Sequence, residues 1–155
     1  MSELADRLAA LEARVAALES AGATAESDPP PSTGGAVGYS GDVHLAGDVS
    51  WSISYSPDGV LGLPPERSVE VLAALGHPVR FAIVRALLRG PMSATALQDT
   101  VDASSAGRLY HHLKALTGAR IVDQHARGDY RLAPSTVVPA LVLMLASADI
   151  AGEVR

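Results

Sequence analysis

The fold is decided by residues 77–132, which read HPVRFAIVRALLRGPMSATALQDTVDASSAGRLYHHLKALTGARIVDQHARGDYRL. Pro78 is suited to the first position of a helix, because a backbone N–H has no intrahelical partner there. Apolar residues then recur at helical spacing up to the stop signal Gly90-Pro91. This pattern predicts a first helix of about three turns.

Two further helices are expected at short intervals after the first. Ser93 is a good N-cap for a helix over 94–101. A polar stretch then breaks the chain, and Ser104 or Ser105 is a good N-cap for a helix over 106–116. Two short helices joined tightly make a helix-turn-helix.

The predicted helix over 106–116 has two different faces. Leu109, Leu113 and Leu116 lie on one apolar stripe, at spacings of four and three residues. The side chains off that stripe are Arg108, Tyr110, His111 and Lys114. One face therefore packs on a core, and the other is left for a partner.

A two-stranded wing is predicted after the third helix. Ile121 and Val122 begin an alternation of apolar and polar residues, the ARGD at 126–129 supplies a turn, and 130–132 return as the second strand. Three short helices followed by such a wing are the plan of a winged helix-turn-helix domain. These domains commonly lay the third helix in the major groove and the wing on the flanking backbone or in the minor groove.

The predicted DNA contacts lie on the third helix and on the wing. They are Ser104, Ser105, Arg108, Tyr110, His111, Lys114, Arg127 and Arg131. From Gly76 to Leu132, eight arginines and lysines oppose four aspartates, which leaves a net charge of +4 in a chain whose total is −5. The predicted DNA-binding segment is thus the basic part of an acidic chain, and its binding should depend steeply on salt. The alternative is that these cationic side chains only keep a helical surface in contact with water and bind no DNA.

A family resemblance is carried by three strings, LGHPVRFAIVRALLRGPMSATALQ, LYHHLKALTGARIV and RGDYRL. Together they resemble the ArsR/SmtB-type winged-helix repressors of bacteria. In that family the first helix often opens with a His-Pro-x-Arg turn, here HPVR, and the recognition helix carries a His-Leu-Lys-x-Leu core, here HLKAL. The resemblance covers residues 66–150. It implies a homodimer whose first and last helices pack across the two-fold axis, with one recognition helix for each half-site.

The metal chemistry of that family does not carry over to this chain. Its sensors of arsenic and zinc use cysteines on the helix-turn-helix, or carboxylates and histidines on the last helix. This chain has no cysteine, and its last helix offers Asp149 and Glu153 without a histidine. The adjacent His111 and His112 point about 100° apart on a helix and cannot chelate one ion together. We therefore predict no metal and no cofactor, with His112 partly buried and His111 exposed toward DNA.

The first 35 residues give a second argument for a dimer. A heptad seam is formed by Leu4, Leu8, Leu11, Val15 and Leu18. This spacing predicts a short coiled-coil helix over 1–20, with an amphipathic helix packed on its own subunit as the alternative. Residues 21–35 are rich in Pro, Gly, Ser and Thr, which predicts a flexible or extended linker.

A change to period two predicts a β-hairpin over 36–56. Every second residue in 49–55 is apolar, the serines between them face the other way, and 46–48 supply a turn. Because an isolated hairpin is not stable, its apolar face must be covered by the winged domain, by the partner subunit or by a ligand. Trp51 and Tyr55 are candidate contacts for an apolar small-molecule effector, and plain core is the alternative for Trp51.

The expected fold class is mainly α with small β, a winged helix-turn-helix domain over 66–152 preceded by the hairpin and the short coiled-coil helix. The apolar run 137–145 is far shorter than the roughly 20 residues that span a bilayer. It predicts a buried helix at a dimer interface, with Pro139 in its first turn. Absence of cysteine and of a signal peptide favours a cytoplasmic protein.

The sequence therefore predicts a sequence-specific transcriptional regulator that binds double-stranded DNA as a homodimer and does not sense metal. The alternative is a protein-interaction or assembly module that uses a winged-helix fold without DNA. No catalytic signature is found, so we expect no enzyme and no membrane partner. An apolar effector, a protein partner or no effector all stay open, as do the operator and the sign of regulation.

Overall fold

The structure is a computed structural model of the chain. The residues that it describes are 34–101, 105–126 and 128–154, together with Arg7, Leu11, Glu12 and Arg14. The predicted coiled-coil helix over 1–20 and linker over 21–35 lie almost wholly outside the described residues, and both stay predictions. The chain divides into two compact units, Met1–Gly38 with Ser54–Leu61, and Tyr39–Ile53 with Gly62–Arg155. The second unit contains every element from α3 to α7 and the turn end of the hairpin.

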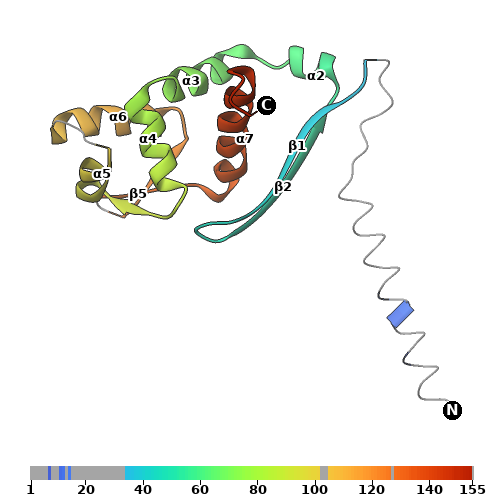
Figure 1. The fold of residues 1–155 in the computed structure, drawn as a ribbon, viewed down its shortest axis with the longest axis horizontal. Coiled ribbons are helices and arrows are strands. Elements are labelled where there is room, and N and C mark those ends of the chain that lie inside the picture. The colour runs from blue at the N-terminus through green and yellow to red at the C-terminus, as the bar shows by residue number, and fades with distance from the viewer. Residues whose placement is uncertain are drawn as a thin grey trace. The chain divides into compact units, whose positions relative to one another are not determined.

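The fold is mainly helical with two small antiparallel sheets, as the sequence predicts. In chain order the elements are β1 (Val37–His44), β2 (Asp48–Tyr55), α2 (Pro57–Leu61), α3 (Pro65–Leu75), α4 (Pro78–Leu87), β3 (Met92–Ser93), α5 (Ala94–Thr100), α6 (Ala106–Gly118), β4 (Val122–Ala126), β5 (Asp129–Leu132) and α7 (Pro134–Ile150). Helices α4, α5 and α6 precede the wing strands β4 and β5, and α7 follows them (Figure 1). This order is that of a winged helix-turn-helix domain, preceded by the predicted β-hairpin.

The helices of this domain begin where local signals place them. Ser93 and Ser105 are the N-caps of α5 and α6, and each hydroxyl accepts a first-turn backbone N–H, at 3.2 and 3.3 Å. Pro78 occupies the first position of α4, as predicted. The N-cap of that helix is His77, whose Nδ1 accepts the N–H of Val79 at 3.2 Å.

The wing belongs to a sheet of three strands in the order β3-β5-β4. Strands β4 and β5 pair antiparallel with Val122 opposite Leu132, as the predicted wing requires. The third strand, β3, was not predicted. It is two residues long and pairs Met92 with Tyr130 of β5, far along the chain. A pairing that short leaves no periodic signal in the sequence.

Helix α3 was not predicted as a separate helix, and Arg80 explains how it is joined to α4. The Nε and Nη2 atoms of Arg80 donate to the carbonyls of Ala74 and Ala73, at 2.5 and 2.8 Å. The last carbonyls of a helix have no intrahelical partner, so a guanidinium is a suitable donor to them. The His-Pro-x-Arg turn is therefore a corner in which His77 begins α4 and Arg80 closes α3.

The core is a single cluster beneath the three-helix layer and the wing. Its fully buried side chains include Ile83, Val84, Leu97, Leu109, Leu113, Leu116 and Val122. The predicted leucine stripe of α6 is thus confirmed as the core face of that helix.

Helix α7 corrects one prediction. It begins at Pro134, so Pro139 lies inside the helix and not in its first turn. Without an N–H, Pro139 leaves the carbonyl four residues earlier without its helical bond. The helix also buries only Val138 and Ala140 fully, and Leu145 is 59% exposed. Among the described residues, no helix is long and apolar enough to cross a membrane.

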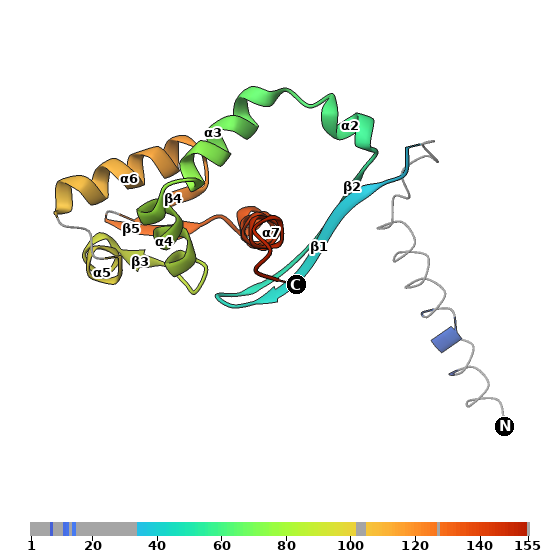
Figure 2. The same ribbon diagram turned by 45° about the horizontal axis from the view of Figure 1, so that its top comes forward.

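The turn end of the hairpin packs against α7. A Cβ built on Gly41 would lie 2.8 Å from Cγ1 of Val138, a separation that real Cβ atoms do not show. Glycine is therefore required where β1 crosses the helix. Two views agree on the arrangement, with α7 between the hairpin and the rest of the winged domain (Figures 1 and 2). The winged domain thus covers part of the hairpin's apolar face, one of the alternatives that the sequence left open.

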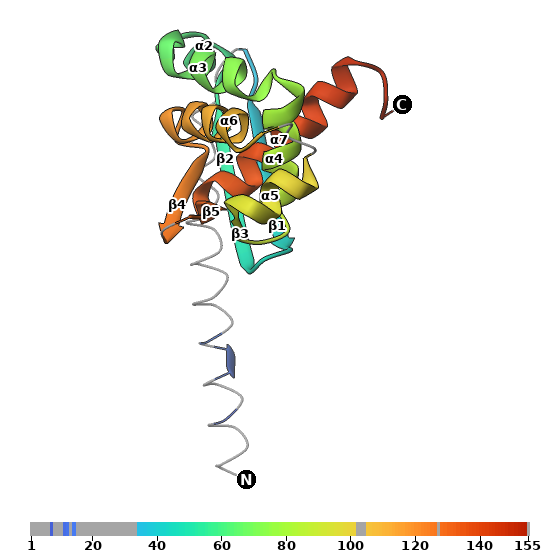
Figure 3. The same cartoon turned by 90° about the vertical axis from the view of Figure 1, so that its left-hand side faces the viewer.

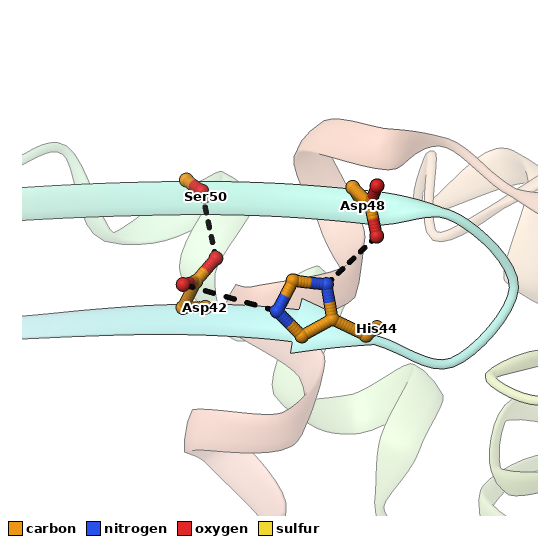
Figure 4. Close-up of polar contacts among 4 residues, drawn as sticks. All are labelled: Asp42, His44, Asp48 and Ser50. Atoms are coloured by element: carbon orange, nitrogen blue, oxygen red, sulfur yellow. Dashed lines mark hydrogen bonds and ion pairs between the residues drawn. The ribbon is translucent and has the colours of Figure 1, made fainter.

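The opposite side of the hairpin turn carries a small polar network (Figure 4). Ser50 donates to the carboxylate of Asp42 at 2.8 Å across the two strands. His44 Nδ1 lies 2.7 Å from the carboxylate of Asp48, across the turn. These contacts support one register of β1 against β2, since each joins residues of opposite strands.

Candidate nucleic-acid interface

The exposed face of α6 gathers four of the predicted site residues. Tyr110 and Lys114 are four residues apart, and Arg108 and His111 are three apart, so all four lie on the side of the helix away from its leucine stripe. All are exposed, and Tyr110 is 53% accessible to solvent. Figure 3 shows α6 with the wing strands β4 and β5 next to it.

The chemistry of this face suits a polyanion that also offers hydrogen-bonding groups on the edges of its bases. Arg108 and Lys114 supply cationic donors for phosphates or for the acceptor edge of guanine. Tyr110 and His111 supply polar groups of the kind that bond to backbone or bases. No carboxylate lies among the described residues of α6, so nothing on the helix itself opposes an anion.

The start of α6 is fixed by Ser105. Its hydroxyl oxygen accepts the N–H of Arg108, which positions the first turn of the helix and with it the Arg108 backbone. A DNA contact by Ser105 stays a prediction. The other predicted N-terminal contact, Ser104, lies outside the described residues.

Gly107 belongs to the same face and was missed by the sequence reasoning. It is exposed, and a Cβ built on it would meet nothing within 4 Å. Inside a helix, glycine costs roughly 0.5 to 1 kcal/mol relative to alanine. Within the described structure no steric reason offsets that cost, so Gly107 leaves the backbone of α6 open to the close approach of a partner.

The wing residues are placed differently from the α6 residues. Arg127, predicted at the wing tip, lies outside the described residues. Arg131 lies on the central strand β5 and is half-buried, and its enclosed Nε has no hydrogen-bond partner among the described residues. It lines a cavity to which α6 contributes no residue. The structure therefore does not bring Arg131 together with Arg108 and Lys114.

His112 lies on α6 between its two faces and is half-buried, as predicted. Its ring centroid lies 4.6 Å from that of His77, the N-cap of α4. Burial lowers the pKa of His112 below 6.5, and the neighbouring His77, Arg80, His111 and Arg108 lower it further. The neutral ring is therefore favoured at this position, although its buried Nδ1 has no hydrogen-bond partner in the part of the chain that the structure describes.

One further group under the wing has a shifted pKa. Burial raises the pKa of the Tyr130 hydroxyl above 10.0, and the nearby Tyr110 adds to the shift. Tyr130 is thus a neutral core residue of β5 near neutral pH.

The predicted ligand contacts Trp51 and Tyr55 lie on strand β2 of the hairpin. Trp51 and Tyr55 are both more than one third exposed and fall in different compact units, so their ligand contact stays a prediction. Among the described residues, no three His, Cys, Asp or Glu side chains are grouped so as to hold a metal ion.

Comparison with protein families matches residues 75–125, from the end of α3 into β4, to the model of a helix-turn-helix domain family. Comparison with curated proteins gives no match. Several solved structures are similar in part. The transcriptional repressor BigR from Xylella fastidiosa is 27% identical over 54% of this chain and 84% of that one, with a TM-score of 0.44.

Two other solved structures give similar figures. Quinone-bound YodB from B. subtilis is 26% identical over 54% of this chain and 96% of that one, with a TM-score of 0.45. The homodimeric winged helix-turn-helix DNA-binding domain Mb0332 from Mycobacterium bovis, described as a possible ArsR-family transcriptional regulator, is 22% identical over 58% and 87%, with a TM-score of 0.48.

The family match and the order of α4, α5, α6, β4 and β5 agree with the resemblance drawn from the sequence. Both findings fall on the same stretch, which contains the buried leucine stripe and the exposed face of α6. The chain therefore contains a winged helix-turn-helix domain.

Proposed function

We propose that this chain is a sequence-specific transcriptional regulator that binds double-stranded DNA as a homodimer. The observation that carries the proposal is the division of α6 into a buried leucine stripe and an exposed face with Arg108, Tyr110, His111 and Lys114. If this face of α6 only contacted solvent, the absence of a side chain at Gly107 would bring no benefit to offset its cost in helix stability. In this proposal α6 enters the major groove and reads base edges.

A role for the wing in DNA binding follows from its position directly after α6. Strands β4 and β5 leave the end of α6, and in winged domains this ribbon contacts the flanking backbone or the minor groove. Phosphate contacts position such a protein and make its affinity dependent on salt. The net charge of +4 between Gly76 and Leu132, in a chain of −5, provides that electrostatic contribution.

The homodimer is supported by apolar surface on α3 and α7. Val69 and Leu72 of α3 are 59% and 56% exposed, and Leu145 and Ile150 of α7 are 59% and 89% exposed. Between these helices and α4 lies an apolar cavity of about 410 Å³ that includes Leu72 among its lining residues. Contiguous exposed apolar surface marks interaction sites in proteins. We propose that α3 and α7 pack against the same helices of a second copy, so that each half-site receives one α6.

The proposal excludes metal sensing on the chemistry of the donors. The chain has no cysteine, and Asp149 of α7 and Glu153, which follows that helix, have no histidine near them in the sequence. Two carboxylates form a hard, incomplete set for zinc or a thiophilic metal.

The proposal is tested by selecting bound fragments from random double-stranded DNA and measuring affinity for the selected sequence. We expect Arg108→Ala and Lys114→Ala each to weaken binding by about tenfold, which corresponds to about 1.4 kcal/mol. Arg67→Ala is the matched control, since it removes the same charge from an exposed residue of α3 that is paired with Glu70. Unchanged affinity in both α6 variants would contradict the assignment of this helix.

An assembly module without DNA binding is the second candidate, favoured by the exposed apolar residues of α3 and α7. It predicts higher oligomers and no enrichment of any DNA sequence in the selection. The two candidates therefore separate in the same experiment.

A further inference from the structure

A cavity lies where the hairpin turn meets the base of the wing. Its volume is about 210 Å³. It is lined by Val43 and the turn residues of the hairpin, by Leu87 and Leu88 at the end of α4, by Arg131 and Leu132 of β5, and by Val137 of α7. All of these residues belong to the same compact unit. An apolar protein cavity of about 150 Å³ is large enough to hold benzene, so this one has room for a ring and one polar group.

Arg131 gives the cavity its chemistry. Its Nε is buried, and among the described residues no acceptor is bonded to it. Because this Nε has almost no accessible surface, a ligand in the cavity can meet only other atoms of the guanidinium. The two terminal nitrogens of a guanidinium are parallel donors, and this geometry matches the two oxygens of a carboxylate.

The remaining walls are mostly apolar and suit a hydrocarbon body. Val43, Val49, Leu87 and Val137 contribute aliphatic side chains. The hairpin turn forms the rim, where Ala46, Gly47 and Asp48 are exposed, so a ligand has a route of entry. Arg131 and Asp48 are the charged residues among the lining residues.

Asp48 does not cancel the attraction of Arg131 for an anion. Its side chain is 88% exposed, where water screens its charge. Its carboxylate also lies 2.7 Å from Nδ1 of His44, as Figure 4 shows. Arg131 is half-buried and thus the less exposed of the two charges, so it sets the preference of the cavity.

We propose that this cavity is a binding site for a small organic acid that has one carboxylate and a compact apolar body. The carboxylate pairs with Arg131, and the body fills the space between the hairpin turn, α4 and α7. This assigns Arg131 to the cavity, in place of the DNA contact expected from the sequence. It also gives the hairpin a role, because without its turn the cavity has no outer wall.

The packing of Gly41 on Val138 holds that outer wall in place. The close approach of β1 to α7 depends on the missing Cβ of Gly41. The hairpin is therefore fitted to α7 at one point and encloses the cavity nearer its turn. A ligand in this site touches β5, the central strand of the wing sheet.

The probes for the test are benzoate and its neutral isostere benzamide, titrated into the full chain by calorimetry and by ligand-observed NMR. Benzoate should bind saturably, with a dissociation constant of about 1 mM or tighter, and benzamide should bind about tenfold more weakly. DNA is absent from the experiment, so the result does not depend on the proposed regulatory function.

Three variants locate the site. Arg131→Leu removes the cation and should weaken benzoate binding by about tenfold, to the level of benzamide. Arg89→Leu is the matched control, an exposed arginine next to the cavity but not among its lining residues, and should leave binding unchanged. Ala46→Trp fills the cavity from its exposed rim without disturbing the core, and should abolish binding of both compounds.

The proposal is overturned by any of three results. These are no saturable binding of benzoate to the unmodified chain, equal affinity for benzoate and benzamide, or undiminished binding in a folded Arg131→Leu or Ala46→Trp variant.

Discussion

At the scale of single residues, the His-Pro-x-Arg turn shows how much structure two side chains can organise. His77 caps the start of α4, and Arg80 caps the end of α3 with two donated hydrogen bonds. The role of Pro78 could be predicted from the sequence, because its effect is confined to its own position. The role of Arg80 could not, because the carbonyls that it caps belong to a helix that carries little periodic signal.

Arg120 occupies a strained backbone position. Its φ is 58°, in the left-handed region, where a residue with a Cβ is destabilised by about 1 kcal/mol. It follows α6 in a Schellman arrangement, in which Ile121 N–H donates to the carbonyl of Leu116 and Arg120 N–H to that of Thr117, both at 3.0 Å.

We therefore predict that Arg120→Gly raises the free energy of unfolding by about 0.5 to 1 kcal/mol relative to Arg120→Ala. The alanine variant removes the same charge but keeps the Cβ, so it isolates the backbone contribution. Urea denaturation of both variants measures the difference. Equal stability of the two would show that the left-handed position carries no strain.

His112 makes stability depend on pH. Because its pKa is lowered in the folded state, the unfolded chain binds more protons below about pH 6.5, and folding stability falls as the pH drops through that range. Above pH 6.5 the ring is neutral in both states and contributes no pH dependence. We predict that His112→Gln gains stability relative to the unmodified chain between pH 7.5 and pH 5.5, measured by urea denaturation. The exposed His125→Gln is the control, and an identical pH dependence in all three proteins would contradict the prediction.

At the scale of elements, the parts that could be predicted are those whose cause is local. Ser93, Ser105 and Pro78 are signals that act within one helical turn, and they placed the starts of α4, α5 and α6 correctly. The parts that could not be predicted depend on distant partners. Strand β3 exists because it pairs with β5, and the position of Pro139 within α7 depends on an earlier start at Pro134.

The same distinction applies to the candidate site. The exposure of the four α6 residues could be predicted, because the helical spacing of the leucines is visible in the sequence and these residues lie off that stripe. The placement of Arg131 in a cavity did not, because the hairpin turn that encloses it is more than eighty residues earlier in the chain. Gly107 was missed because a glycine near a helix N-terminus can serve several purposes. The open space around Gly107, which the sequence does not show, is what favours a close approach of a partner.

Gly107 gives a prediction in which stability and function move in opposite directions. Gly107→Ala should stabilise the protein by about 0.5 to 1 kcal/mol, because alanine favours the helix and meets nothing within 4 Å. It should weaken DNA binding by about tenfold if the backbone of α6 approaches DNA closely at this point. Gly118→Ala, at the other end of α6, is the control and should leave DNA affinity unchanged. Unfolding free energy and DNA affinity are measured on the same preparations, and undiminished DNA affinity in Gly107→Ala would contradict the close approach.

At the scale of the whole molecule, charge and apolar surface separate into different regions. The stretch from Gly76 to Leu132 is basic, whereas exposed apolar residues are found on α3 and α7 and also on the hairpin and α2. A dimer through α3 and α7 would leave both α6 helices available to DNA. A homodimer that binds DNA through α6 therefore accounts for both the basic surface and the exposed apolar residues of α3 and α7.

The dimer gives its own prediction. Leu145→Glu places a charge on the exposed apolar side of α7, and it should raise the dimer dissociation constant by about thirtyfold, or about 2 kcal/mol. Sedimentation equilibrium over a concentration series measures it. Leu61→Glu is the control, since Leu61 is 84% exposed and lies on α2. A chain that is monomeric throughout, or a Leu145→Glu variant that dimerises as tightly as the control, would exclude this interface.

The most direct test of the DNA-binding claim is the salt dependence of affinity for the selected DNA, compared between the unmodified chain and Lys114→Ala. The logarithm of the association constant should fall linearly with the logarithm of the salt concentration. Loss of one phosphate contact from each of two subunits should reduce the magnitude of that slope by about 2. Binding that does not respond to salt, or a slope that Lys114→Ala leaves unchanged together with full affinity in Arg108→Ala, would contradict the assignment of α6 as the DNA-binding helix.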